Sequence, residues 1–278
     1  MPLLGFGVYQ NFDAKPSVLE AFKAGYRHVD SAQVYRNEPA VGEAIKESGL
    51  DRKELFITTK CLSKPPKKTT IEDGGAKDIK EGVRTSLVNL FGLDKNGELD
   101  KEAYIDLFLI HDPLSGRERR LAIYKALQDA KEAGQIRSVG VSNFGVKHLE
   151  ELKEGGFAEK MPAVNQIELH PLCQQKPIVD YCKANSIVVQ AYCPIIRGQM
   201  DIPAVQKIAK DHKRDPAQIL LRWSLQKGYV PLPKSATPSR IHSNAQLYDF
   251  ELNEKEMSEL DALDSERGAI SWNPVNAD

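Results

Sequence analysis

The sequence predicts a single α/β domain, residues 1–278, folded as a closed (β/α)8 TIM barrel. Eight short runs rich in β-branched residues alternate with amphipathic helical stretches, a pattern typical of parallel strands joined by helices. The chain has 278 residues, close to the length of about 250 residues that is typical of one-domain barrels. No linker or repeat divides it. An open, doubly wound parallel sheet is the alternative.

Each expected strand is a short apolar run that ends at a polar residue or a turn. The strands are Leu3–Tyr9, Arg27–Asp30, Leu55–Lys60, Ile105–His111, Ser138–Ser142, Ala163–Glu168, Val188–Tyr192 and Val230–Pro233.

Each expected helix has apolar residues at helical spacing, and several carry end signals. Gly25 and Gly134 follow helical stretches, as a left-handed terminal position favours. Asp215 followed by Pro216 indicates a further helix start, with the aspartate as cap. The helices are Lys15–Ala24, Glu38–Ser48, Ile79–Phe91, Arg119–Ala133, Lys147–Glu154, Lys176–Ala184, Ile202–His212 and Pro238–Ala245.

Composition narrows the class of partner. The chain carries 38 Lys and Arg against 39 Asp and Glu, so no net positive field attracts nucleic acid. No apolar run approaches the roughly 18 residues of a membrane helix. Four scattered cysteines and six histidines show no metal-binding spacing. We therefore expect a cytoplasmic protein that binds a small molecule, with no metal, no nucleic acid and no membrane partner. A monomer is the default, and a weak homodimer is the alternative.

Polar residues gather where the expected strands end, which is where barrels carry their sites. Gly5-Phe6-Gly7 lies in the first strand without a third glycine, so the usual dinucleotide-binding turn is absent and a nucleotide must be held in another way. The polar strand-end residues are Asp30, Lys60, His111, Ser142, Asn143, Gln166, Tyr192, Lys234 and Ser235.

Four of the residues in this region together have the chemistry of a general acid catalyst. A phenol such as Tyr35 has a pKa of about 10, and an ammonium at Lys60 would lower it by stabilising the phenolate. Asp30 would hold Lys60 in its charged form, and His111 would orient a carbonyl oxygen. Together they would protonate the oxygen of a carbonyl group while a bound cofactor delivers hydride.

Each of the four also has a purely structural interpretation. Asp30 alone could cap a helix, Tyr35 could pack in a loop, Lys60 could be solvated, and His111 could be a core histidine. Their occurrence together at consecutive strand ends favours catalysis.

Six sequence blocks in order resemble the aldo-keto reductase family, from about Leu4 to about Leu263. Gly25-Tyr-Arg-His-Val-Asp-Ser-Ala32, followed by Tyr35-Arg-Asn-Glu38, together resemble the one block that holds its catalytic Asp and Tyr. The other blocks are Thr59-Lys60, Leu109-Ile-His111 with Pro113, Gly140-Val-Ser-Asn-Phe144, Asn165-Gln-Ile-Glu-Leu-His-Pro171, and Pro233-Lys-Ser235 with Arg240-Ile241 and Asn244.

The resemblance implies an NADPH-dependent reductase of aldehydes or ketones with Tyr35 as general acid, tuned by Asp30 and Lys60. It implies that Tyr192 stacks on the nicotinamide and that Asn244 contacts the adenine. The 2′-phosphate would be bound by Lys234, Ser235 and Arg240, because a dianionic phosphate rewards charge-assisted hydrogen bonds. The nicotinamide carboxamide would be bound by Ser142, Asn143 and Gln166.

The chain departs from the family pattern at three positions. Ser243 replaces a glutamate before Asn244, which removes an adenine contact. Asp112 replaces an aromatic residue, which would make the substrate wall negative. Cys193 replaces a serine after Tyr192.

The expected substrate pocket comprises Tyr9, Asp112 and Trp272. Surrounding segments are Ser63–Lys77, Ser115–Arg119 and Ile195–Met200, with the tail, residues 265–278, folded over the mouth or packed on the barrel side.

Two other functions remain open from the sequence. An NADPH-binding regulatory or redox-sensor subunit with slow turnover would keep the same nucleotide site. A metal-dependent hydrolase would need clustered ligands, for which the strand ends offer only Asp30, His111 and Glu168.

Overall fold

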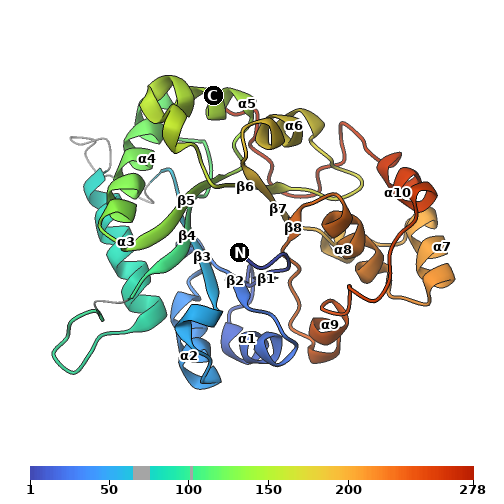
Figure 1. Cartoon of the computed structure of the whole chain (residues 1–278), viewed down its shortest axis with the longest axis horizontal. Helices are drawn as coiled ribbons and strands as arrows, with labels where there is room; N and C mark the ends of the chain where they lie inside the picture. Colours follow the sequence, from blue (N-terminus) through green and yellow to red (C-terminus); the bar gives the residue numbers. More distant parts are fainter. Residues whose placement is uncertain (65–75, 101–102) are drawn as a thin grey trace.

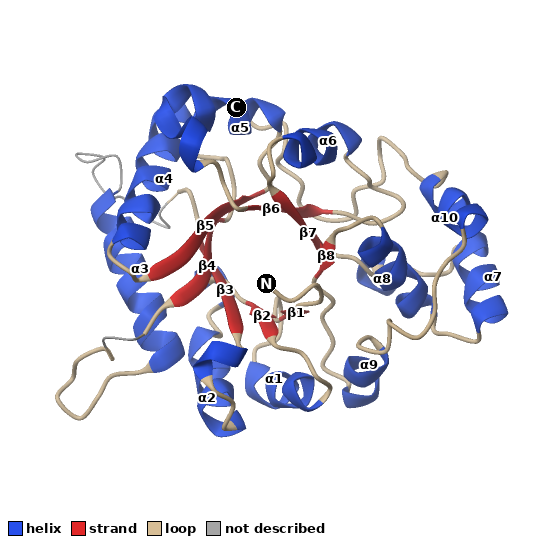
Figure 2. Cartoon of the chain, in the orientation of Figure 1, coloured by secondary structure: helices blue, strands red, loops and turns tan. Residues whose placement is uncertain are grey.

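The computed structural model describes residues 1–64, 76–100 and 103–278. Eight parallel strands follow one another in chain order, β1-β2-β3-β4-β5-β6-β7-β8, and curl into a ring with the helices outside it (Figures 1 and 2). The predicted (β/α)8 barrel is confirmed. The strands are β1 (Phe6–Gly7), β2 (His28–Asp30), β3 (Phe56–Cys61), β4 (Ile105–Ile110), β5 (Ile136–Ser142), β6 (Val164–Glu168), β7 (Val188–Tyr192) and β8 (Val230–Pro231).

The helices alternate with the strands and cover the outer face of the ring (Figure 2). They are α1 (Ala14–Lys23), α2 (Glu38–Ser48), α3 (Ala76–Phe91), α4 (Arg117–Glu132), α5 (Val146–Leu152), α6 (Lys176–Ala184), α7 (Pro203–His212), α8 (Pro216–Gln226), α9 (Pro238–Ser243) and α10 (Glu254–Asp261). The Asp215–Pro216 signal does open α8, whose side chains are mostly buried. The polar stretch that forms α10 was not predicted, because its apolar face is narrow.

Two backbone hydrogen bonds close the ring between the first and last strands. The amide of Gly5 donates to the carbonyl of Pro231 at 3.1 Å, and that of Gly7 donates to Pro233 at 3.0 Å. A Cβ at Gly5 would lie 2.5 Å from Cδ2 of Leu232. Gly5 and Gly7 therefore allow the first and last strands to approach closely.

Side chains inside the ring change from apolar to polar toward the carboxyl ends of the strands. Leu107, Leu109 and Val164 form a small apolar cluster that is separate from the main core between strands and helices. Because strand side chains alternate between faces, positions two residues further along stay inside the ring. Gln166 follows Val164 in this way, and the polar site begins at its level.

No helix among the described residues is both long and apolar enough to cross a membrane.

The close approach at Gly5 predicts a measurable cost. Gly5→Ala should lower the free energy of unfolding by about 1–3 kcal/mol, because the added methyl overpacks the β1–β8 contact. Urea unfolding followed by circular dichroism checks this. Gly82→Ala in α3 is the control, since its Cβ would meet only the flexible amide of Gln33 at 3.1 Å and alanine favours helix. Equal stability of wild type and Gly5→Ala would contradict the interpretation.

Candidate active site

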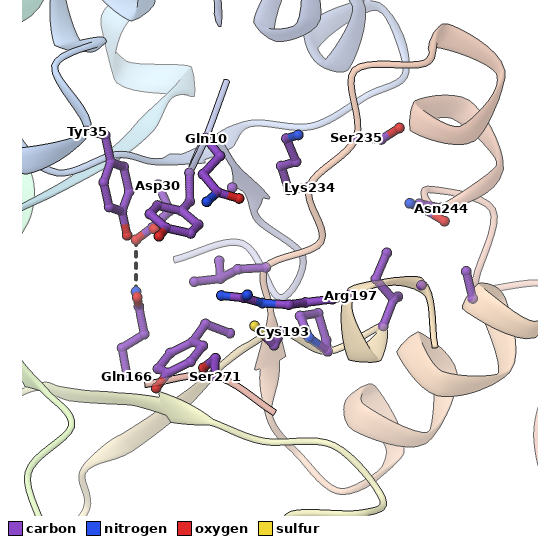
Figure 3. A pocket seen from close by; sticks show the side chains of 18 of the residues that line it. Gln10, Asp30, Tyr35, Gln166, Cys193, Arg197, Lys234, Ser235, Asn244 and Ser271 are labelled. Atoms are coloured by element: carbon purple, nitrogen blue, oxygen red, sulfur yellow. Dashed lines mark hydrogen bonds between the residues drawn. The ribbon is translucent and has the colours of Figure 1, made fainter. Parts of the chain in front are cut away.

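A cavity of about 850 Å³ opens at the carboxyl ends of the strands. It collects most of the residues singled out from the sequence, and Figure 3 shows side chains from opposite sides of the ring pointing into it. Lys60 lies behind its wall, fully buried. The predicted residues that line the cavity are Tyr9, Asp30, Tyr35, His111, Ser142, Asn143, Gln166, Tyr192, Lys234, Ser235, Arg240, Asn244 and Trp272.

A buried ion pair joins β2 and β3 at the base of the cavity. Nζ of Lys60 lies 2.5 Å from Oδ1 of Asp30 and 2.8 Å from the carbonyl oxygen of Ser31. The other carboxylate oxygen of Asp30 accepts a hydrogen bond of 2.8 Å from Nε2 of Gln166, across the barrel on β6 (Figure 3). Both partners of the pair are thus fixed by groups on other strands.

Tyr35 is held beside this pair by a short 3-10 turn, Gln33–Tyr35. Its hydroxyl lies 3.5 Å from Nζ of Lys60. The ring packs against Tyr9 at 5.0 Å and edge-on to His111 at 5.7 Å between centroids. Nε2 of Gln33 donates to the carbonyl of Gly82 in α3 at 2.8 Å, which ties the turn to the surrounding helix layer.

The pKa values of this cluster differ from the expectation. Burial raises the pKa of Tyr35 well above its ordinary value, and the carboxylate of Asp30 raises it further. Burial lowers the pKa of Lys60, while Asp30 opposes that change. Burial therefore sets the direction of the Tyr35 pKa in this structure, and the lowering that the Lys60 ammonium would bring by stabilising a phenolate stays a prediction. Tyr35 is a phenol that keeps its proton.

His111 ends β4 and is held through its backbone. Its amide donates to the carbonyl of Cys61 at 2.8 Å, and its carbonyl accepts from Nδ2 of Asn143 at 3.0 Å. The ring nitrogen Nδ1 is buried without a partner among the described residues. Burial, with the charge of Lys60 in second place, lowers the pKa of His111 to about 3. The imidazole is neutral at physiological pH and offers one donor and one acceptor.

Uncharged hydrogen-bonding groups lie at the carboxyl ends of β5 to β7. Oγ of Ser142 donates to the carbonyl of Gln166 at 2.8 Å. Asn143 adopts a left-handed backbone with φ of 61°, a conformation that asparagine tolerates better than most residues. Its Oδ1 accepts from the hydroxyl of Tyr192 at 2.8 Å. This part of the cavity suits a neutral, planar amide group.

Cationic side chains lie around the start of α9, at another part of the cavity. Lys234 and Arg240 are exposed, and neither has an ion-pair partner among the described residues. Nη2 of Arg240 donates to Oγ1 of Thr237 at 2.5 Å. Asn244 is buried beside them, and Ser243 also lines the cavity. Two unpaired cations near a buried serine, Ser235, suit a phosphate group.

The tail folds over the mouth of the cavity. The Trp272 ring lies edge-on to His111, with centroids 6.2 Å apart. Tyr9 lines the same region and is half exposed. Of the segments expected around the pocket, Ser63–Lys77 lies largely outside the described residues.

Asp112 does not line the cavity, which corrects the expectation of a negative substrate wall. Its side chain is buried, and its Oδ1 accepts hydrogen bonds from Oγ of Ser63 at 2.5 Å and from the amide of Leu114 at 3.0 Å. A carboxylate held in this way fixes the loop after β4 and does not line the cavity.

Two of the expected pocket segments do reach the cavity. Arg197, in the segment Ile195–Met200 after β7, points into it (Figure 3), and Ser271 contributes from the tail. Sequence reasoning missed the start of α8, which contributes Asp215 and Pro216. The helix signal at Asp215 was visible in the sequence, but its distance from the strand ends gave no reason to place it at the site. Among the described residues no group of three or more His, Cys, Asp or Glu is arranged to hold a metal.

The burial of His111 predicts how it titrates. Its side-chain NMR signals should stay those of neutral imidazole from neutral pH down to about pH 4, assigned by their loss in His111→Gln. Below about pH 6.5 the unfolded chain takes up a proton that the folded chain refuses, so this histidine makes the fold less stable as pH falls toward 3. A titration midpoint close to 6.5 would contradict the buried, neutral assignment.

Comparisons with known proteins agree with this geometry. The family model for the aldo/keto reductase family matches residues 4–265. The chain is 42% identical over 270 residues to a glyoxal reductase of Bacillus subtilis, covering 96% of this chain and 90% of that protein.

Solved structures show the same similarity. A mutant of Gox0644 in complex with NADPH has a TM-score of 0.85 and 31% identity, covering 100% of this chain and 95% of that one. A Bombyx mori aldo-keto reductase in complex with NADP has a TM-score of 0.79 and 31% identity, covering 95% and 89%. With the barrel, the cavity and a family match over most of its length, the chain belongs to the aldo/keto reductase family.

Proposed function

We propose that this protein is an NADPH-dependent reductase that converts aldehydes or ketones to alcohols, with Tyr35 as the proton donor. The observation that carries the proposal is the chain Asp30–Lys60–Tyr35. In it a protonated phenol faces the cavity, and a buried ammonium lies 3.5 Å from its oxygen. Relatives solved with NADPH or NADP, and relatives named as reductases, support the same chemistry.

The cavity fits a phosphorylated dinucleotide. Its amide-rich part at Ser142, Asn143 and Gln166 would hold the nicotinamide carboxamide, with Tyr192 against the ring. The two unpaired cations, Lys234 and Arg240, would hold the 2′-phosphate that distinguishes NADPH from NADH. Asn244 would bind the adenine end. When bound, the dinucleotide supplies the hydride that reduces the carbonyl carbon.

The residues of this chain would manage the proton. The phenol of Tyr35 donates a hydrogen bond to the carbonyl oxygen and gives up its proton as negative charge develops there. A raised pKa keeps this proton in place beforehand, and an alkoxide is a strong enough base to remove it. The ammonium of Lys60 then stabilises the phenolate, and Asp30 keeps Lys60 in position. His111, neutral and beside Tyr35, directs the carbonyl oxygen toward the phenol.

Removing the phenolic hydroxyl tests the proton donor. Tyr35→Phe should lower kcat for aldehyde reduction by about two to four orders of magnitude, the usual range for a lost general acid. NADPH binding, measured by fluorescence quenching, should stay near wild type. Tyr248→Phe, at a tyrosine that is 63% exposed, is the control and should keep full activity. Substantial turnover by Tyr35→Phe would remove Tyr35 from the assignment.

Removing one cation tests the coenzyme choice. Arg240→Ala should weaken NADPH binding roughly ten- to a hundredfold, the equivalent of a hydrogen bond to a charged group, and leave NADH binding nearly unchanged. Titration of both coenzymes measures this, with Arg117→Ala as an exposed control outside the cavity lining. An equal loss for NADPH and NADH would place Arg240 away from the 2′-phosphate.

A further inference from the structure

Glu168 is a buried carboxylate for which the proposed mechanism has no use. It is the last residue of β6, its side chain is fully buried, and it has no lysine or arginine partner among the described residues. Side chains two residues apart on a strand share a face, so Glu168 stands one level above Gln166. At that level the barrel wall ends and the C-terminal tail passes over it.

The carboxylate of Glu168 binds the tail directly. Oε1 accepts from the amide of Ile270 at 2.6 Å and from Nε2 of His170 at 3.0 Å. Oε2 accepts from Oγ of Ser271 at 2.6 Å and from its amide at 3.2 Å. Burial alone would raise the pKa of Glu168, but the hydrogen bonds from His170, Ser271 and Ile270 outweigh it and lower the pKa.

The next residue of the tail is Trp272, which contacts the site. Its ring lies edge-on to His111. Its carbonyl oxygen lies 2.8 Å from the hydroxyl oxygen of Tyr192, whose single proton is shared with Oδ1 of Asn143. Ser271 lines the same cavity (Figure 3). The side chain that faces the substrate is therefore set by the backbone position at residues 270 and 271, which Glu168 holds.

Between the anchors of the tail, the stretch is held by the hydrogen bonds of Glu168 and by the packing of Ile270 against the core. The amide of Ser265 donates to the carbonyl of Leu172 at 3.1 Å, and the carbonyl of Ala277 is bound by Nε2 of His148 at 2.8 Å. These contacts fix the start and the end of the tail but touch neither Ile270 nor Trp272. The half-exposed Trp272 has no comparable anchor of its own beyond Tyr192.

We propose that Glu168 is a positioning residue for substrate binding, whose carboxylate fixes Trp272 against His111 as an apolar wall for the group attached to the carbonyl. The inference rests on the proposed reductase function of the cavity. Loss of the Glu168 carboxylate should therefore weaken the binding of carbonyl compounds with an aromatic substituent more than it weakens the binding of NADPH. The reason is that the contacts of Glu168 reach Trp272 and not the cationic part of the cavity.

Glu168→Gln tests the proposal with little change in volume. The two carboxylate oxygens of Glu168 now accept four hydrogen bonds. The glutamine side chain has only one acceptor oxygen, so its NH2 group would face some of the groups that now donate to the carboxylate. For an aromatic aldehyde, KM should rise about tenfold, the equivalent of one lost hydrogen bond to a charged group. The kcat value should change little, and the Kd for NADPH should stay within about twofold of wild type. Glu132→Gln, on the surface, is the matched control.

Tryptophan fluorescence reads the position of Trp272 without turnover. The only other tryptophan, Trp223, is fully buried, and its contribution is measured in Trp272→Phe. Acrylamide should quench Glu168→Gln more strongly than wild type, and this difference should vanish when Trp272→Phe is combined with it. Because this readout needs no reductase activity, failure of the proposed function and failure of this inference are distinguishable.

Two results would overturn the proposal. One is unchanged quenching and unchanged KM in a folded Glu168→Gln. The other is a KM increase from Glu168→Gln that persists in full in the Trp272→Phe background, since a residue acting through Trp272 has nothing left to position there. If Glu168→Gln does not fold, Ser271→Ala removes only the 2.6 Å hydrogen bond. Ser271→Ala should raise both KM and acrylamide quenching, each by a smaller factor than expected for Glu168→Gln. If neither KM nor quenching changed, the proposal would also be overturned.

Discussion

The site depends on one constraint, which is that the ammonium of Lys60 is kept inside the barrel without water. A buried charge is tolerated only when it is paired and hydrogen-bonded. Asp30 and the carbonyl of Ser31 meet that need, and Gln166 holds the second oxygen of Asp30 from across the ring. Loss of either charge would leave the other buried and unpaired, which typically costs about 3–5 kcal/mol. The strand ends are therefore held together by the same contacts that equip them for chemistry.

This constraint divides the cavity into parts with different electrostatics. Near the ion pair the groups that face the interior are neutral, because burial keeps the proton on Tyr35 and keeps His111 uncharged. Around α9, Lys234 and Arg240 are exposed and unpaired among the described residues. A ligand with a neutral planar end and a multiply charged end matches this arrangement. The tail completes the neutral part by placing Trp272 beside His111.

Much of this arrangement could be predicted from the sequence, because it follows from local patterns. Strand alternation with polar residues at the carboxyl ends predicted both the barrel and the grouping of Asp30, Lys60 and His111. The direction of the Tyr35 pKa could not be predicted, since burial depends on contacts with Tyr9 and other distant residues. Asp112 was misassigned because its partner Ser63 lies on another loop.

Long-range contacts account for the other omissions. The start of α8 reaches the cavity only through the three-dimensional course of the chain before it. The sequence around Glu168 does not indicate that this residue holds the tail. Its hydrogen-bond partners Ile270 and Ser271 lie 102 and 103 residues further along the chain. Such contacts become visible only when the tail is placed.

The reductase function is tested most directly by following NADPH oxidation by absorbance against a panel of aldehydes, ketones and a ketoacid, with NADH in parallel. At least one carbonyl compound should be turned over, with a clear preference for NADPH. Tight NADPH binding without turnover of any member of the panel would contradict it, and would favour an NADPH-binding regulatory or sensor protein instead.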